Sequence, residues 1–138
     1  MALPPGHRLA TQAKFTLADL SAEPFVCLSA TSGLRAILDA AGAEAGFTPH
    51  VPFETHSPAS IRELVSAGLG VALLAASAAT RPGPPIGVRE VHPSPRHPPI
   101  GLICHRDRRL TAAAQACRRH LLARPPQSGS PIVHPPPG

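Results

Sequence analysis

Two short polar loops carry the side chains of this chain that are best suited to binding chemistry. Residues 29–33 (SATSG) follow a short apolar run, and residues 55–57 (THS) follow an extended run. Each loop leads into a predicted helix, whose first turn has free N–H groups that suit an anion such as a carboxylate. Hydroxyl side chains add further hydrogen-bond donors. Helix capping alone also explains Ser32 and Ser57, and one hydroxyl can serve both uses.

Other kinds of chemistry find no support in the residue pattern. The chain has no nucleophile elbow, no Walker loop and no pair of carboxylates within one element. Its C-terminal histidines and cysteines form no recognised metal-ligand spacing. We therefore predict no enzyme activity, no metal site and no cofactor. These C-terminal histidines and cysteines are His92, His97, Cys104, His105, Cys117 and His120.

The loop at 55–57 belongs to a predicted strand–helix–strand unit. Val51–Thr55 is extended, and its Pro52 fits an edge strand or the start of a strand. Ser57 can cap a helix in which Pro58 takes the first position, where no N–H is needed. This order of residues predicts that the second polar loop joins the end of a strand to the start of a helix.

The helix that follows is predicted to bury one face. Arg62 should point away from that face. Gly68 is placed for a left-handed helix cap and Gly70 for a tight turn. Val71–Leu74 is a continuous apolar run, typical of a strand buried on both faces. The buried stripe has the i, i+3, i+4 spacing of Ile61, Leu64 and Val65.

The loop at 29–33 is predicted to be held in the same way. A helical turn at Thr16–Leu20 precedes a short strand at Phe25–Leu28, and a helix follows the loop until Gly46. Arg35 and Asp39 form a surface i, i+4 pair on that helix. Strand and helix alternate through both units, which predicts a parallel sheet with right-handed crossovers. The apolar stripe of this helix is Leu34, Ile37, Leu38 and Ala41.

The C-terminal half carries weaker signals, and its prolines concentrate in two stretches. One helical turn is predicted at Ala75–Thr80, a weak strand at Ile86–Val91, a better strand at Ile100–His105 and a helix at Leu110–Ala123. The residues after 124 are rich in Pro, Ser and Gly and are predicted to be disordered. The predicted apolar side of the last helix is Ala113, Ala114, Cys117 and Leu121.

Charge and cysteine content restrict the setting in which the chain works. The net charge is +5, but the basic residues are dispersed and no aromatic residues interleave with them, which favours a solvated surface over a nucleic-acid patch. Three cysteines without a short spacing predict reduced, mostly buried thiols. The chain shows no signal peptide and no apolar run of membrane-spanning length, so we predict a cytoplasmic protein with no membrane partner.

Five segments in order resemble the C-terminal effector-binding domain of LysR-type transcriptional regulators. The resemblance runs from about Leu3 to Ala123 and lies in the order and spacing of the segments. It implies an α/β fold like that of periplasmic binding proteins (type 2), with a nearly complete second subdomain and a partial first one. The segments are HRLA, ADLSAEPFVCLS, SGLRAILDAAGAEAGFTP, ELVSAGLGVALLAASAA and IGLICHRDRRLTAAAQACRRHLL.

The same resemblance divides the chain and implies a truncated member. The N-terminal helix-turn-helix and the opening units of the first subdomain are missing from the sequence. The implied parts are a crossing-strand stump and turn at 1–14, the second α/β subdomain at 15–79, a proline-rich connection at 80–99, the closing strand and helix of the first subdomain at 100–123, and a disordered tail at 124–138.

The function that the resemblance implies is the sensing of a small anionic or aromatic metabolite. Full-length regulators of this kind reach DNA through the missing helix-turn-helix and assemble as homo-oligomers. A solute-binding module of a transport system is the alternative, which the missing export signal disfavours. The family's effector-contacting loops match the two polar loops, so the predicted effector-binding residues are Thr31, Ser32, Gly33, Thr55, His56 and Ser57.

Overall fold

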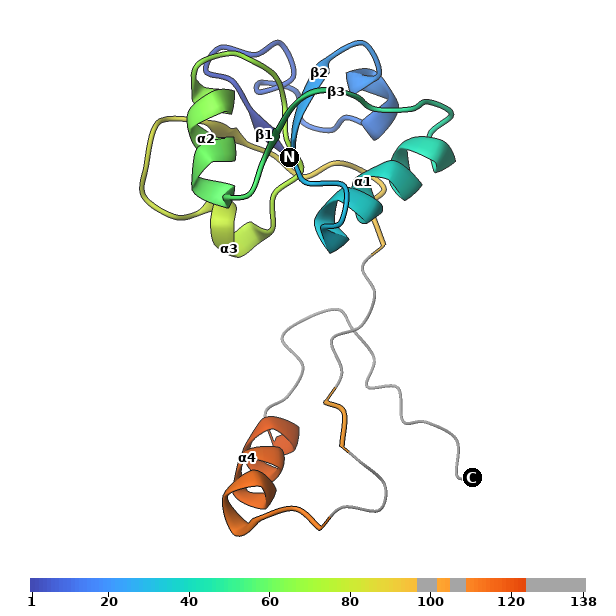
Figure 1. Cartoon of the computed structure of the whole chain (residues 1–138). Coiled ribbons are helices and arrows are strands. Elements are labelled where there is room, and N and C mark those ends of the chain that lie inside the picture. The colour runs from blue at the N-terminus through green and yellow to red at the C-terminus, as the bar shows by residue number, and fades with distance from the viewer. Residues whose placement is uncertain (97–101, 105–108, 124–138) are drawn as a thin grey trace. The chain divides into compact units, whose positions relative to one another are not determined.

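The computed structural model describes residues 1–96, 102–104 and 109–123 of the chain. It divides into two units, Met1–His97 and Pro98–Gly138. The first unit carries the described strands and all but one of the described helices (Figure 1). None of the described helices is long and apolar enough to cross a membrane.

The strands of the first unit form two two-stranded sheets, and isolated bridges at Val71 and Ala72 link one sheet to β2 (Pro24–Leu28) of the other. β3 (His50–Thr55) pairs with β2 in parallel, and Val71 bridges to Phe25 on the other side, also in parallel. Next to Val71, Ala72 bridges to Ala2 in β1 (Ala2–Leu3), which pairs with β4 (Gly87–Val88). The predicted parallel arrangement of the three central segments is confirmed.

The third of these segments differs from its prediction. Val71–Leu74 was expected to be a regular strand, but it makes isolated bridges at Val71 and Ala72 alone. Val71 exchanges backbone hydrogen bonds with β2, through Pro24 O and Val26 N, and Ala72 exchanges bonds with Ala2. Each of the two neighbours, β1 and β2, therefore makes one pair with this segment.

Proline at position 52 has the edge-strand location that the sequence predicts. Pro24 pairs with His50 and Val26 pairs with Phe53, so β3 has one more residue than β2 between these two pairs. β3 pairs only with β2, and its irregularity falls at Val51–Pro52. A bulge at that point accommodates the missing proline N–H without disturbing the end of the strand.

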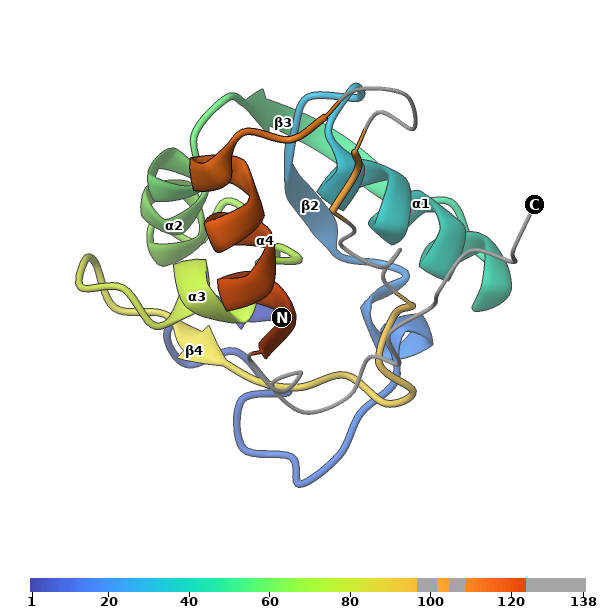
Figure 2. The same cartoon turned by 90° about the horizontal axis from the view of Figure 1, so that it is seen from below.

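Two helices cover opposite faces of β2. α1 (Gly33–Glu44) follows β2, and α2 (Pro58–Ser66) follows β3. Figure 2 shows β2 between these two helices. Two short elements complete the unit, the 3₁₀ helix η1 (Leu17–Leu20) and the single turn α3 (Ala76–Ala79), as the sequence predicts.

The strand periodicity separates the core into two apolar clusters. Phe25 and Cys27 point into the cluster that contains Leu38 of α1. Val26 points into the cluster on the other face, with Ile61 and Val65 of α2. Successive side chains of a strand point to opposite faces, so one short strand supplies both clusters. Both faces of β2 are therefore covered.

Arg62 lies outside both apolar clusters, but the sequence does not reveal the contacts that it makes there. Its Nη1 donates to the carbonyl oxygen of Ala79 (2.9 Å) and its Nε to that of Pro84 (2.8 Å). Arg62 therefore binds the chain that leaves α3 and holds it against α2. An arginine with five donors can satisfy two such carbonyls at once.

The C-terminal predictions are only partly met. β4 is two residues long, where Ile86–Val91 was predicted as a strand. Residues 102–104 form no strand, and the other residues of Ile100–His105 lie outside the described part. α4 (Ala112–Ala123) confirms the last helix, but none of its residues is buried. The tail at 124–138 also lies outside the described residues.

Replacing Gly70 by Ala should destabilise the first unit by about 2 kcal/mol or more. A Cβ atom at this position would lie 3.0 Å from the carbonyl carbon of Pro24 and still closer to its oxygen, which accepts from Val71 N. Urea denaturation gives the free energy of unfolding. Gly33→Ala is the control, since its Cβ would meet nothing within 4 Å. Equal stability of the two variants would contradict the close-approach argument.

Candidate functional site

The two predicted loops begin side by side in the structure. Leu28, the last residue of β2, is the ladder partner of Thr55, the last residue of β3. Because the strands are parallel, both loops leave the same edge of the sheet, and α1 and α2 start there. The structure therefore places the starts of the two predicted loops side by side at one edge of the sheet.

The first loop is organised by its own hydroxyl groups. Ser32 caps α1, with its Oγ accepting a hydrogen bond from Leu34 N (3.3 Å). The hydroxyls of Ser29 and Thr31 lie 3.2 Å apart and share a hydrogen bond. Thr31 and Gly33 are exposed, and Ser32 is half-buried. The capping prediction for Ser32 is confirmed, and its ligand contact stays a prediction.

The second loop has the same design. Ser57 caps α2 by accepting from Ala59 N (3.2 Å), and Pro58 takes the first helical position. Thr55 Oγ1 accepts from Ser57 N (3.4 Å). His56 between them is exposed. The loop is thus organised by side-chain acceptors.

The electrostatics of both loops favour a negative partner. Neither α1 nor α2 has an acidic residue in its first turn, so no carboxylate on these turns offsets their positive dipole ends. A serine that caps a helix uses an oxygen lone pair, and its O–H remains able to donate. The paired loops can therefore offer several neutral donors to one carboxylate.

An ion network lies beside the site. Arg35 of α1 donates to Asp39 on the same helix, at 3.0 Å, and to Glu54 of β3, at 2.8 Å. The predicted Arg35–Asp39 pair is confirmed, but the sequence does not reveal the contact with Glu54. Hydrogen bonds to Asp39 and then Glu54 raise the pKa of Arg35, against the effect of its burial.

Cys27 lies near the same network and is chemically quiet. Burial raises the pKa of this thiol to about 11, and the charge of Arg35 offsets only part of the effect. The prediction of mostly buried cysteines is correct for Cys27 alone, because Cys104 and Cys117 are exposed. A thiol that stays protonated at neutral pH is a poor nucleophile.

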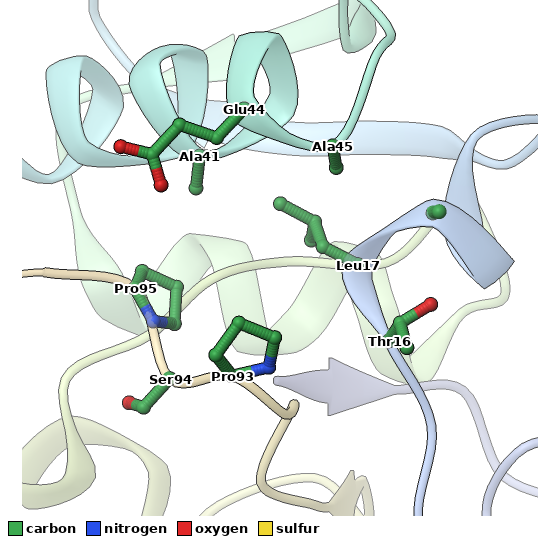
Figure 3. Close-up of a pocket in the computed structure, with 9 residues that line it drawn as sticks. Thr16, Leu17, Ala41, Glu44, Ala45, Pro93, Ser94 and Pro95 are labelled. Carbon is green, nitrogen blue, oxygen red and sulfur yellow. The ribbon is translucent and has the colours of Figure 1, made fainter.

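A pocket of about 330 Å³ lies away from the predicted loops, at the other end of α1 (Figure 3). Leu17, Ala41 and Ala45 form apolar walls, with Glu44 on one side. Glu44 already pairs with Arg96 (3.1 Å). The pocket joins η1, the end of α1 and residues 93–95. No short sequence pattern could have predicted it, because these three segments are far apart in the chain.

The arrangement supports binding rather than catalysis. No group of three metal-ligating side chains occurs among the residues that the structure describes. The predicted site residues are hydroxyls, His56 and the N-terminal turns of two helices, which are groups that suit an anion. These features are those of an α/β domain with a polar edge that suits an anion.

The chain belongs to the LysR substrate binding domain family, whose model matches residues 1–126. It is 38% identical over 72 residues to the transcriptional activator protein LysR of Escherichia coli (strain K12). The matched stretch covers 52% of this chain and 23% of that protein. The chain thus spans about a quarter of this curated relative. The predicted family is confirmed, and it is a family of regulators, not of enzymes.

Solved structures agree with this assignment. The C-terminal domain of a probable LysR family regulator from Rhodococcus sp. RHA1 superposes with a TM-score of 0.68 at 29% identity, covering 88% of this chain and 62% of that one. The effector binding domain of QuiR in complex with shikimate gives 0.63 at 21% identity, covering 86% and 56%. The fold is therefore the predicted α/β fold of LysR effector-binding domains, which resembles periplasmic binding proteins of type 2.

At pH 8 a thiol reagent such as 5,5′-dithiobis(2-nitrobenzoate) should modify two of the three cysteines quickly and Cys27 only after unfolding. Cys104 and Cys117 are exposed, whereas Cys27 is buried and its pKa is about 11. Absorbance at 412 nm counts the released thiolate. Cys27→Ser is the control and should leave the fast phase unchanged. Three equally fast thiols in the folded protein would contradict this description.

Proposed function

We propose that this effector-binding domain senses a small anionic or aromatic metabolite at the two loops that end β2 and β3. The observation that carries the proposal is the meeting of two capped helix N-termini without an acidic residue in either first turn. Thr31, Ser32 and Gly33 supply donors from one side, and Thr55, His56 and Ser57 from the other.

The ligand of a solved relative supports the chemical class. The effector binding domain of QuiR was solved with shikimate, a ring that carries one carboxylate. A molecule of this kind has an anionic end for the helix N-termini and a ring for apolar contact. We extend this class of ligand to the present chain as part of the proposal.

The remaining features of a whole regulator are proposed by family likeness. A full-length protein of this kind would act in the cytoplasm, bind DNA through a helix-turn-helix and form homo-oligomers. Within the chain, residues 15–79 would be the second subdomain and residues 100–123 the closing part of the first. The regulatory family of the matched relatives favours this role over that of a transport module.

Isothermal titration calorimetry against shikimate, benzoate and other small carboxylates tests the proposal. At least one carboxylate should bind saturably, while benzamide, the neutral counterpart of benzoate, should not compete. Thr55→Val should weaken binding about tenfold, the usual effect of losing a hydrogen bond to a charged group. Thr48→Val is the control, because Thr48 is exposed near the opposite end of the same strand. A folded chain that binds no carboxylate would refute the proposal.

A further inference from the structure

Arg35 joins the first turn of α1 to the end of β3. Its Nε contacts both oxygens of Asp39, at 3.0 and 3.1 Å, and its Nη1 contacts Glu54 Oε1 at 2.8 Å. The arginine side chain is 16% exposed, whereas both carboxylates are about half exposed. An arginine whose side chain has little exposed surface and two carboxylate partners is held more firmly than one in a single surface ion pair.

The Arg35–Glu54 pair lies next to both predicted loops in the sequence. Arg35 follows Gly33 by two residues, and Glu54 immediately precedes Thr55. Among the described residues, the Arg35–Glu54 contact is the side-chain hydrogen bond that connects α1 directly with β3. The ladder between β2 and β3 fixes the strands, but it does not by itself fix where the first turn of α1 lies above them.

We infer that Arg35 and Glu54 are positioning residues, whose ion pair sets the distance between the two loops and thereby controls how tightly a carboxylate is held. This inference rests on the proposed function. The pair contacts no ligand itself. It acts by holding Ser32 and Gly33 at a fixed separation from Thr55, so that donors on both loops can reach one anion.

Glu54 could instead affect binding through its charge alone. A carboxylate beside an anion site repels the ligand, so removing that charge would strengthen binding. The positioning role predicts the opposite for a variant that loses contact with Arg35. Glu54→Gln removes the charge and keeps an oxygen that can accept from Arg35. Glu54→Thr removes the charge and the reach, while threonine still suits a strand.

Titration calorimetry with shikimate and benzoate separates the two roles. Glu54→Thr should raise the Kd about fivefold or more, and Glu54→Gln should stay within about twofold of the unaltered chain. Asp39→Asn is the matched control, since it changes the other partner of the same arginine within α1 alone. It should also stay within about twofold. A purely stabilising role for Arg35 would make Asp39→Asn and Glu54→Thr equal.

Amide hydrogen exchange in the free chain tests the same inference without a ligand. The N–H groups of Leu34, Ser57 and Ala59 report loop order, because they donate to the hydroxyls of Ser32, Thr55 and Ser57. Their exchange should accelerate severalfold in Glu54→Thr and not in Asp39→Asn. Unchanged exchange in Glu54→Thr, or binding as tight as in the unaltered chain, would overturn the inference. Failure of the unaltered chain to bind any carboxylate would refute the proposed function instead, and the exchange result would then decide the positioning role.

Discussion

β2 and β3 run parallel and in register at their carboxyl ends, and the remaining structure depends on that pairing. Leu28 and Thr55 are ladder partners, so the loops that follow them leave the sheet together. The side chains of β2 alternate between two apolar clusters, each covered by one helix. With both faces of the strand occupied, its end is where polar side chains can meet a ligand. The location of the candidate site is a consequence of the packing.

Small residues allow the sheet to continue beyond this pair. Gly70 lies against the carbonyl of Pro24, which lets Val71 exchange two backbone hydrogen bonds with β2. Ala2 and Ala72 are fully buried beside Ile61 and Val65 of α2. Larger side chains at these alanines would push α2 away from the sheet. The first three residues of the chain thus belong to the same core as the central strands.

The elements that the sequence predicts well are those with local signals. Ser32, Ser57 and Gly68 act as helix caps because capping depends only on neighbouring backbone groups. Contacts between distant segments carry no such signal. The link from Arg35 to Glu54, the bond from Arg62 to Ala79 and the pocket beside Leu17 each join residues that the fold brings together. Val71–Leu74 has the composition of a strand, but it makes single bridges to β1 and β2, and composition alone does not show how far a ladder extends. The two loops were predictable because strand ends and helix starts are both local, while their adjacency required the parallel pairing.

Chemical-shift mapping of the ¹⁵N-labelled chain titrated with shikimate and benzoate tests the central claim most directly. If the paired loops form the effector site, the largest amide shifts should fall on residues 31–35 and 55–60, from both sides of the site at once. Residues 16–18, 41–45 and 93–95, which include those that line the pocket at the far end of α1, should change little. Shifts centred on that pocket, or on only one of the two loops, would contradict the account.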